Sequence, residues 1–144
     1  MIGRQLMRRG GDFNEHNIAE FRKNHGKVGG WFEGTPLLLI HTYGRRTNTQ
    51  RVNPVMYLKD GERYLVFASK GGSDTHPDWF LNLMAHPDVQ IEVGDDTIDI
   101  HADEVKGREH DELYGRQAML YPQFGEYQRK TKRIIPVIAL SKKK

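Results

Sequence analysis

The most regular hydrophobic patterns in this chain predict β-strands. Residues 37–40 are four consecutive apolar side chains between Pro36 and Gly44. Such a short, bounded run is typical of a strand that is buried on both faces. Residues 51–58 follow as a second strand, so the connection between the two begins near Gly44.

Two hairpins are predicted further along the chain. The apolar runs 55–58 and 64–68 are separated by an Asp-Gly turn, which favours tight antiparallel pairing. Residues 89–93 and 98–102 alternate apolar and polar side chains on either side of Gly94, as strands with one exposed face do. A last strand is expected over residues 134–140, where Pro136 indicates an edge or a bulge.

Helices are predicted between and before these strands. Asn14 or Asp12 can cap a short helix over residues 15–24, and Gly26 is placed to end it. Two more are expected, from His76-Pro77-Asp78 to Pro87 and over residues 108–121. About six mostly antiparallel strands with two to four peripheral helices predict an α+β, mainly β fold, a small and partly open barrel.

Chain length favours a single domain. The 144 residues divide into an N-terminal segment, 1–30, with a short helix and a flexible glycine-rich lead, and one domain over residues 31–144. Without cysteine the chain has no disulfide and no thiolate chemistry. No secretory signal is recognisable, so we expect a cytoplasmic protein. The basic start, with Arg4, Arg8 and Arg9 around Leu6 and Met7, leaves peripheral contact with the inner membrane face open.

Cations concentrate in the connection after residue 44. Its donors are Arg45, Arg46, Thr47, Asn48 and Arg51. A second element, Lys70 followed by Gly71, places a cation beside unshielded backbone amides after the neighbouring strand. A solvated hairpin loop is the plain alternative. Pro54, inside the strand that follows the cluster, favours a ligand site instead, because proline costs a ladder hydrogen bond. The net charge of +3 suits an anionic ligand, but no nucleic-acid-binding module is present.

Aromatic side chains form a second constellation. Its members are Trp79, Tyr121, Phe124 and Tyr127. The last three recur at intervals of three residues, which places them on one face of a short helix. Core packing explains Phe124 well, whereas the hydroxyls of the two tyrosines suit a half-open pocket. The histidines are too scattered to predict a metal site, and Ser69 is not in a hydrolase nucleophile motif.

Three stretches, taken in order, resemble the deazaflavin-dependent nitroreductase family, whose members use coenzyme F420. They are GRRTNTQRVNPVMYL, FASKGGSDTHPDWFLNLMAHPDVQI and MLYPQFGEYQ, and the likeness covers residues 31–139. It implies a split β-barrel related to FMN-binding proteins. It also implies hydride transfer from reduced F420 to a quinone, an enone lactone or a nitroaromatic.

The resemblance implies roles for individual residues. The cofactor's phosphate and oligoglutamate tail would be held by Arg45, Arg46, Thr47, Asn48 and Arg51. Its tail and ring would be lined by Asn53, Pro54, Ala68, Ser69, Lys70 and Gly71. The acceptor would lie near Met56, Ser69, Trp79, Tyr121, Phe124 and Tyr127. Ser69 or Tyr127 would donate a hydrogen bond to the reacting acceptor. Relatives that activate nitroimidazoles have tyrosines where this chain has Met56 and Phe124.

Two alternatives stay open at this point. One keeps the fold and replaces F420 by FMN, whose single phosphate needs fewer cations. The other is a non-catalytic protein that binds or carries F420. The sequence leaves the physiological acceptor and the oligomeric state undetermined.

Overall fold

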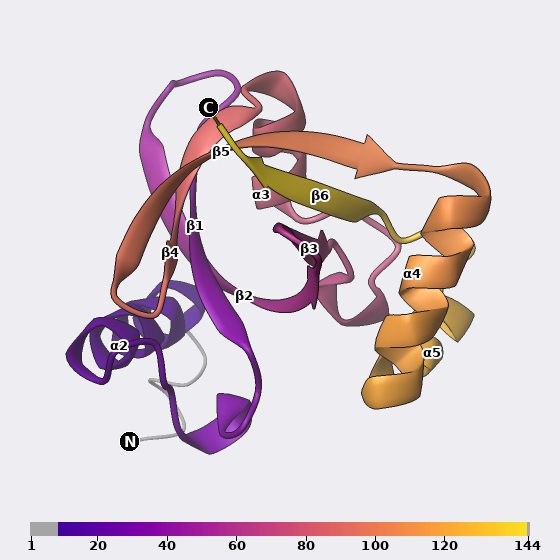
Figure 1. Ribbon diagram of the computed structural model, residues 1–144, viewed down its shortest axis with the longest axis horizontal. Helices are drawn as coiled ribbons and strands as arrows, with labels where there is room; N and C mark the ends of the chain where they lie inside the picture. The colour runs from indigo at the N-terminus through magenta and orange to yellow at the C-terminus, as the bar shows by residue number, and fades with distance from the viewer. Residues whose placement is uncertain (1–8, 144) are drawn as a thin grey trace.

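Six antiparallel strands close into a barrel in the order β1-β2-β3-β6-β5-β4 (Figure 1). The computed structural model describes the backbone of residues 9–143 and the side chains of residues 13–30 and 32–143. The strands are β1 (Leu37–Tyr43), β2 (Gln50–Asp60), β3 (Arg63–Phe67), β4 (Asp88–Val93), β5 (Asp96–Val105) and β6 (Val137–Lys142). The predicted barrel of six strands is therefore confirmed, and it is closed rather than partly open.

Helices lie around this barrel. They are α2 (Arg9–Lys23), α3 (Asp78–Ala85), α4 (Gly107–Leu120) and α5 (Gln123–Arg129), with 3-10 turns η1 (Gly30–Phe32) and η2 (Lys70–Gly72). In Figure 1, α2 lies at one side of the barrel and α4 with α5 at the opposite side. Within the described residues no helix is long and apolar enough to cross a membrane. The basic residues Arg4 and Arg8 lie outside the described residues, so the predicted lipid contact is untested.

Both predicted hairpins are present. Asp60 pairs with Arg63 across a tight turn between β2 and β3, and Val93 pairs with Asp96 between β4 and β5. Short turns fix the register of such hairpins, and the register decides which side chains face the core.

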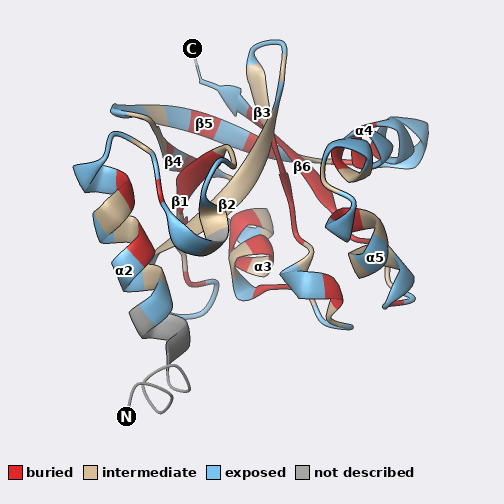
Figure 2. Ribbon diagram, turned by 90° about the horizontal axis from the view of Figure 1, so that it is seen from below, coloured by how far each residue is buried: buried red, intermediate tan, exposed pale blue. Residues whose placement is uncertain are grey.

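The apolar run at the start of β1 is buried on both faces, and the core shows why. Leu38 and Ile40 point into the cluster that fills the barrel. Leu37 and Leu39 point the other way, into a cluster that includes Phe21 of α2. Buried residues accordingly line the strands on the side of α2 as well as inside the barrel (Figure 2). The segment that contains α2 thus covers the second face of β1.

Pairing of β2 changes along its length. Residues 50–56 pair with β1, whereas β3 pairs with β2 only from Tyr57 to Asp60. On the β3 side, the first half of β2 has no ladder partner within the described part of the chain. Pro54 lies in this half, where its missing N–H costs nothing on the unpaired edge. Pro54 therefore lies on an unpaired edge, and the ligand site that it favours there stays a prediction.

Two predicted boundaries are wrong. The first described helix begins at Arg9, so neither Asn14 nor Asp12 is its cap. The longer helix lets Phe13 pack on Phe32, with ring centroids 6.1 Å apart. Gly26 does close the helix: its N–H donates to the carbonyl of Phe21 at 2.8 Å, and its φ is +98°.

The last strand begins at Val137 rather than at residue 134. Ile134 is exposed, and the N–H of Ile135 donates to the side chain of Gln128 rather than to a ladder. Residues 134–136 are therefore irregular, and the strand begins directly after Pro136. The division of the chain at residue 30 stays a prediction.

Candidate functional site

The arginine-rich connection between β1 and β2 is a compact loop. Its ends are joined by the N–H of Gly44, which donates to the carbonyl of Thr49 at 2.8 Å. The N–H of Asn48, a residue with φ of +60°, donates back to Gly44 at 2.7 Å. A shallow pocket of about 200 Å³ lies against this loop. It is lined by Gly44, Arg45, Arg46, Thr47, Arg51, Asp78 and Asn82.

Three arginines line this pocket, and only one of them is bound to other side chains of the described residues. Asn82 of α3 accepts hydrogen bonds from the backbone N–H of Arg45 at 3.1 Å and from its Nη1 at 2.8 Å. Asp78 lies 3.7 Å from the same guanidinium. Arg46 and Arg51 are exposed, and neither forms an ion pair with any residue that the structure describes. Two uncompensated positive charges beside a pocket favour an anionic ligand.

Backbone geometry at η2 produces a second anion-binding element. Ser69 has right-handed helical torsions, and Lys70 and Gly71 follow with φ of +47° and +63°. This succession points neighbouring N–H groups into one concavity, an arrangement known as a nest. The N–H groups of Lys70 and Gly71 have no acceptor in the described part of the chain. They are free to bind an anion or a carbonyl oxygen.

Close packing joins this nest to α5. Gly72 has φ of +86°, and a Cβ at this position would lie 2.8 Å from the carbonyl oxygen of Tyr127. Lys130 extends the contact by donating to the carbonyl of Gly71 at 3.2 Å. The glycine therefore lets Ser69 and Lys70 lie beside the helix that carries the aromatic residues.

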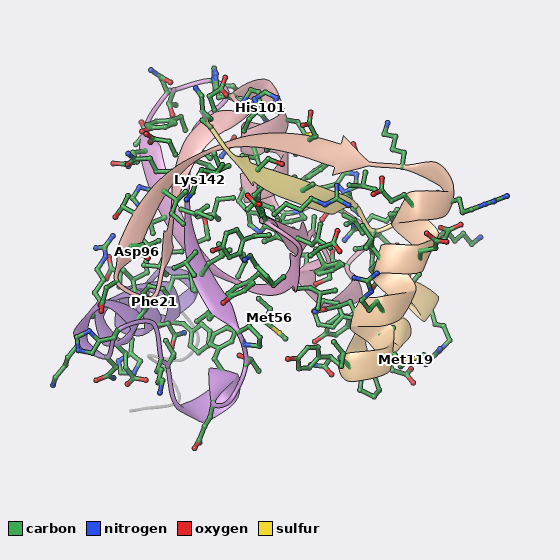
Figure 3. All side chains as sticks on the ribbon, viewed as in Figure 1. Phe21, Met56, Asp96, His101, Met119 and Lys142 are labelled. Carbon is green, nitrogen blue, oxygen red and sulfur yellow. The ribbon has the colours of Figure 1, made fainter. Side chains whose placement is uncertain are left out.

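Four of the predicted acceptor residues share one apolar cluster. They are Met56, Tyr121, Phe124 and Tyr127. Figure 3 shows Met56 between β2 and the side of the molecule occupied by α4 and α5. Phe124 is buried, whereas the two tyrosines are half-buried, and neither hydroxyl is hydrogen-bonded to a described residue. Trp79 packs against the barrel-filling cluster instead, so the structure does not bring it into this group.

Remaining predicted residues border the unpaired edge of β2. Asn53 and Pro54 lie on that strand, half-buried. Ala68 is buried, and its N–H donates to the carbonyl of Pro136 at 3.0 Å. Ser69 is half-buried, and its hydroxyl makes no hydrogen bond within the described residues. The arginine loop thus lies at one end of this edge, where Asn82 of α3 holds Arg45, and the nest lies near the other end.

Three polar residues at the site were not predicted from the sequence. Asn82 is 2% exposed on α3 and holds Arg45. Arg133 donates to backbone carbonyls of the segment that contains the nest. Gln117 is fully buried on α4, and neither polar atom of its side chain has a partner within the described residues. Only Asn82 carried a signal, as an amide between Phe80 and Leu83 on an apolar helix face.

Cations thus border the unpaired edge of β2, beside an aromatic wall formed by Met56, Tyr121 and Tyr127 over buried Phe124. This arrangement is typical of a split-barrel protein that binds an anionic cofactor. The family model described as F420H(2)-dependent quinone reductase matches residues 14–142. The chain therefore belongs to the F420H(2)-dependent quinone reductase family.

Individual relatives agree with this assignment. An F420H(2)-dependent quinone reductase of Mycobacterium tuberculosis is 37% identical over 131 residues, 87% of each chain. The solved structure of the F420-H2 dependent reductase FDR-A is 36% identical and covers 74% of this chain and 94% of its own, with a TM-score of 0.67. A second structure, described as a domain-swapped dimer, is 31% identical and covers 88% of this chain and 95% of its own, with a TM-score of 0.69.

Family membership confirms the resemblance seen in the sequence, the oxidoreductase class and F420 as the cofactor. FMN had been the alternative cofactor on the same fold. The roles given to individual residues stay predictions.

We predict that Gly72→Ala destabilises the protein far more than Gly71→Ala. Both residues have positive φ, which costs alanine about 1 to 2 kcal/mol, but only Gly72 faces a backbone atom at 2.8 Å, and Gly71 faces open space. Unfolding in urea should show a loss of about 2 to 4 kcal/mol for Gly72→Ala, because overpacking adds to the torsional cost. Equal losses in the two variants would contradict the close contact with α5.

Proposed function

We propose that this protein transfers a hydride from reduced F420 to a quinone. The observation that carries the proposal is the contact of Gly72 with Tyr127, which places the donors of the nest beside the aromatic wall. An acceptor on that wall would lie next to a cofactor ring held at the nest.

Donors at the open edge of β2 fit a cofactor with a long anionic tail. Arg46 and Arg51 supply free charge at one end, and the N–H groups of Lys70 and Gly71 supply donors at the other. We assign the phosphate and oligoglutamate tail to Arg45, Arg46, Thr47, Asn48 and Arg51. The segments that would line the cofactor between these ends are Asn53 with Pro54, and Ala68 with Ser69. FMN has one phosphate and would leave most of these cations without a partner.

When bound, reduced F420 supplies a hydride, that is, two electrons and one proton, and is oxidised. A quinone that takes up this hydride and one further proton becomes a hydroquinone. This chain's task is to position the two reactants, exclude water and stabilise the negative charge that develops on the acceptor oxygen. Ser69 and Tyr127 are the two candidate donors, because neither hydroxyl is engaged elsewhere in the described residues.

Acceptor binding is assigned to the half-buried wall of Met56, Tyr121 and Tyr127 over buried Phe124. A planar, electron-poor ring suits such a surface, since stacking on aromatic faces needs little directional bonding. Trp79 lies in a different cluster, so we give it no contact with the acceptor in this arrangement.

Turnover with a quinone tests this function directly. Purified protein mixed with reduced F420 should oxidise it when menadione is added. The absorbance of the oxidised deazaflavin should then increase at a rate that is proportional to enzyme concentration. If the protein binds F420 tightly but none of the quinones tested leads to its oxidation, the protein would be a carrier instead. A protein without affinity for F420 would contradict the proposal as a whole.

Removing one free cation should weaken cofactor binding. We expect Arg51→Gln to raise the Kd for F420 about tenfold, the value of one charge-assisted hydrogen bond. The difference from wild type should shrink in high salt, because Arg51 is exposed and its charge is screened. Arg108→Gln, which removes an exposed cation at the start of α4, is the control and should bind F420 normally. An unchanged Kd in Arg51→Gln would remove this residue from the binding site.

The hydroxyl of Ser69 is predicted to act in turnover rather than in cofactor binding. Ser69→Ala should lower kcat about a hundredfold, as loss of one donor to a developing oxyanion does, with a nearly unchanged Kd for F420. Ser141→Ala, at an exposed serine on β6, is the control. Steady-state rates with menadione and a binding titration distinguish the two effects. An unaltered kcat would assign proton or hydrogen-bond donation to another group, with Tyr127 as the next candidate.

A further inference from the structure

The guanidinium of Arg133 forms hydrogen bonds with both ends of the segment that contains the nest. Arg133, in the irregular segment between α5 and β6, donates to three backbone carbonyls. The acceptors are Ala68 at 3.2 Å and Ser69 at 2.8 Å on one side of η2, and Ser73 at 2.7 Å on the other. A single side chain therefore joins the two ends of the turn. Its planar fork of five N–H groups allows this, which the single ammonium of a lysine does not.

The Arg133 segment is itself anchored to α5. The side-chain amide of Gln128 donates to the carbonyl of Arg133 at 2.7 Å, and its oxygen accepts the N–H of Ile135 at 3.0 Å. Arg133 forms no ion pair with any described residue, and burial lowers its pKa, which nearby Tyr114 and Asp74 oppose. A half-buried cation surrounded by carbonyls rather than carboxylates is costly, so we expect a specific role for it.

Orientation of the peptide groups supplies that role. The carbonyl of Ser69 points at Arg133, and it belongs to the same planar peptide as the N–H of Lys70. In a trans peptide the two groups point in opposite directions. Arg133 therefore turns the N–H of Lys70 away from itself, toward the open side of the nest. Without the guanidinium, nothing else in the described residues holds this carbonyl except the N–H of Gly72, at 2.9 Å.

The fourth partner of Arg133 adds a titratable group. His76 Nδ1 lies 3.0 Å from Nη1 of Arg133, and since arginine can only donate, this nitrogen must be unprotonated. The ring also packs on Phe80 of α3, with centroids 4.8 Å apart. Burial lowers the pKa of His76 and the charge of Arg133 lowers it further, while Glu104 of β5 acts in the opposite direction. Protonation would place two cations against each other and break this contact.

We propose that Arg133 is a positioning residue that presents the Lys70–Gly71 nest to the cofactor, and that it does so only while His76 is neutral. This inference rests on the proposed function. Neither residue touches the cofactor in this scheme: both act through the backbone of residues 68–73. Cofactor affinity should consequently depend on pH through a group outside the binding site.

Hydrogen exchange without cofactor tests the positioning itself. In Arg133→Lys, which keeps the charge but loses the fork, backbone amides of residues 68–76 should exchange about tenfold faster than in wild type. Arg129→Lys is the matched control, because Arg129 is an exposed arginine of α5 that pairs with Glu126. Equal exchange in all three proteins would overturn the proposal, even if F420 were not the ligand.

Cofactor binding tests the consequence. Arg133→Lys should raise the Kd for F420 about tenfold, equivalent to roughly one net hydrogen bond, and should raise KM for reduced F420 more than it lowers kcat. Arg129→Lys should behave as wild type. A wild-type Kd in Arg133→Lys would overturn the proposal. Failure of wild type to bind F420 would instead contradict the proposed function and leave the exchange result to decide on Arg133.

The pH dependence provides a second route that does not need an arginine variant. His76 has a lowered pKa, so it is neutral at pH 7 and becomes protonated only as the pH falls below its ordinary value of 6.5. The Kd of wild type should therefore rise in that acidic range. His76→Gln keeps an oxygen that accepts from Arg133 and cannot be protonated, so it should lose this part of the pH dependence. Identical pH profiles in the two proteins would overturn the role of His76.

Discussion

The site depends on a mismatch in length between neighbouring strands. β2 has eleven residues and β3 has five, and their ladder joins only four pairs. Half of β2 is thus left with one unpaired edge. In a soluble protein such an edge must be covered or charged, because free N–H and C=O groups invite other strands. Here the arginine loop lies at one end of the edge and the nest near the other, and Pro54 removes one of its donors.

The arginines near this edge differ in whether the protein itself hydrogen-bonds their guanidinium groups. Arg46 and Arg51 are exposed and unpaired among the described residues, so a ligand can compensate them at little desolvation cost. Arg133 is committed to the protein by backbone carbonyls, whereas Arg45 lines the pocket and is held there by Asn82. Cations that look equivalent in the sequence therefore divide into those that are free to bind a ligand and those that shape the loops.

Local patterns predicted the parts of this fold that local physics determines. Tight turns specified both hairpins, and the apolar run 37–40 was correctly interpreted as buried on both faces. The arginine loop and the glycines after Lys70 were also visible, because cations and glycine carry their signal within a few residues. The role of Arg133 was not visible in the sequence, because its hydrogen-bond partners lie 57 to 65 positions away. Basic residues also precede it in the sequence, so nothing distinguishes Arg133 from them. The start of α2 was also predicted wrongly, and the turn that lies before the predicted start packs Phe13 on Phe32, a contact that no local pattern indicates.

Gln117 places a buried amide, without a partner among the described residues, beside the apolar cluster that contains the aromatic wall. Leu113 and Tyr114 belong to that cluster and lie three or four positions before Gln117 on α4, so they share one helix face with it. An amide with no partner there costs free energy of about 1 to 3 kcal/mol, which leucine or methionine of similar size would avoid. The cost therefore falls on the face of α4 that packs in this cluster, and the apolar packing of Leu113 and Tyr114 has to outweigh it.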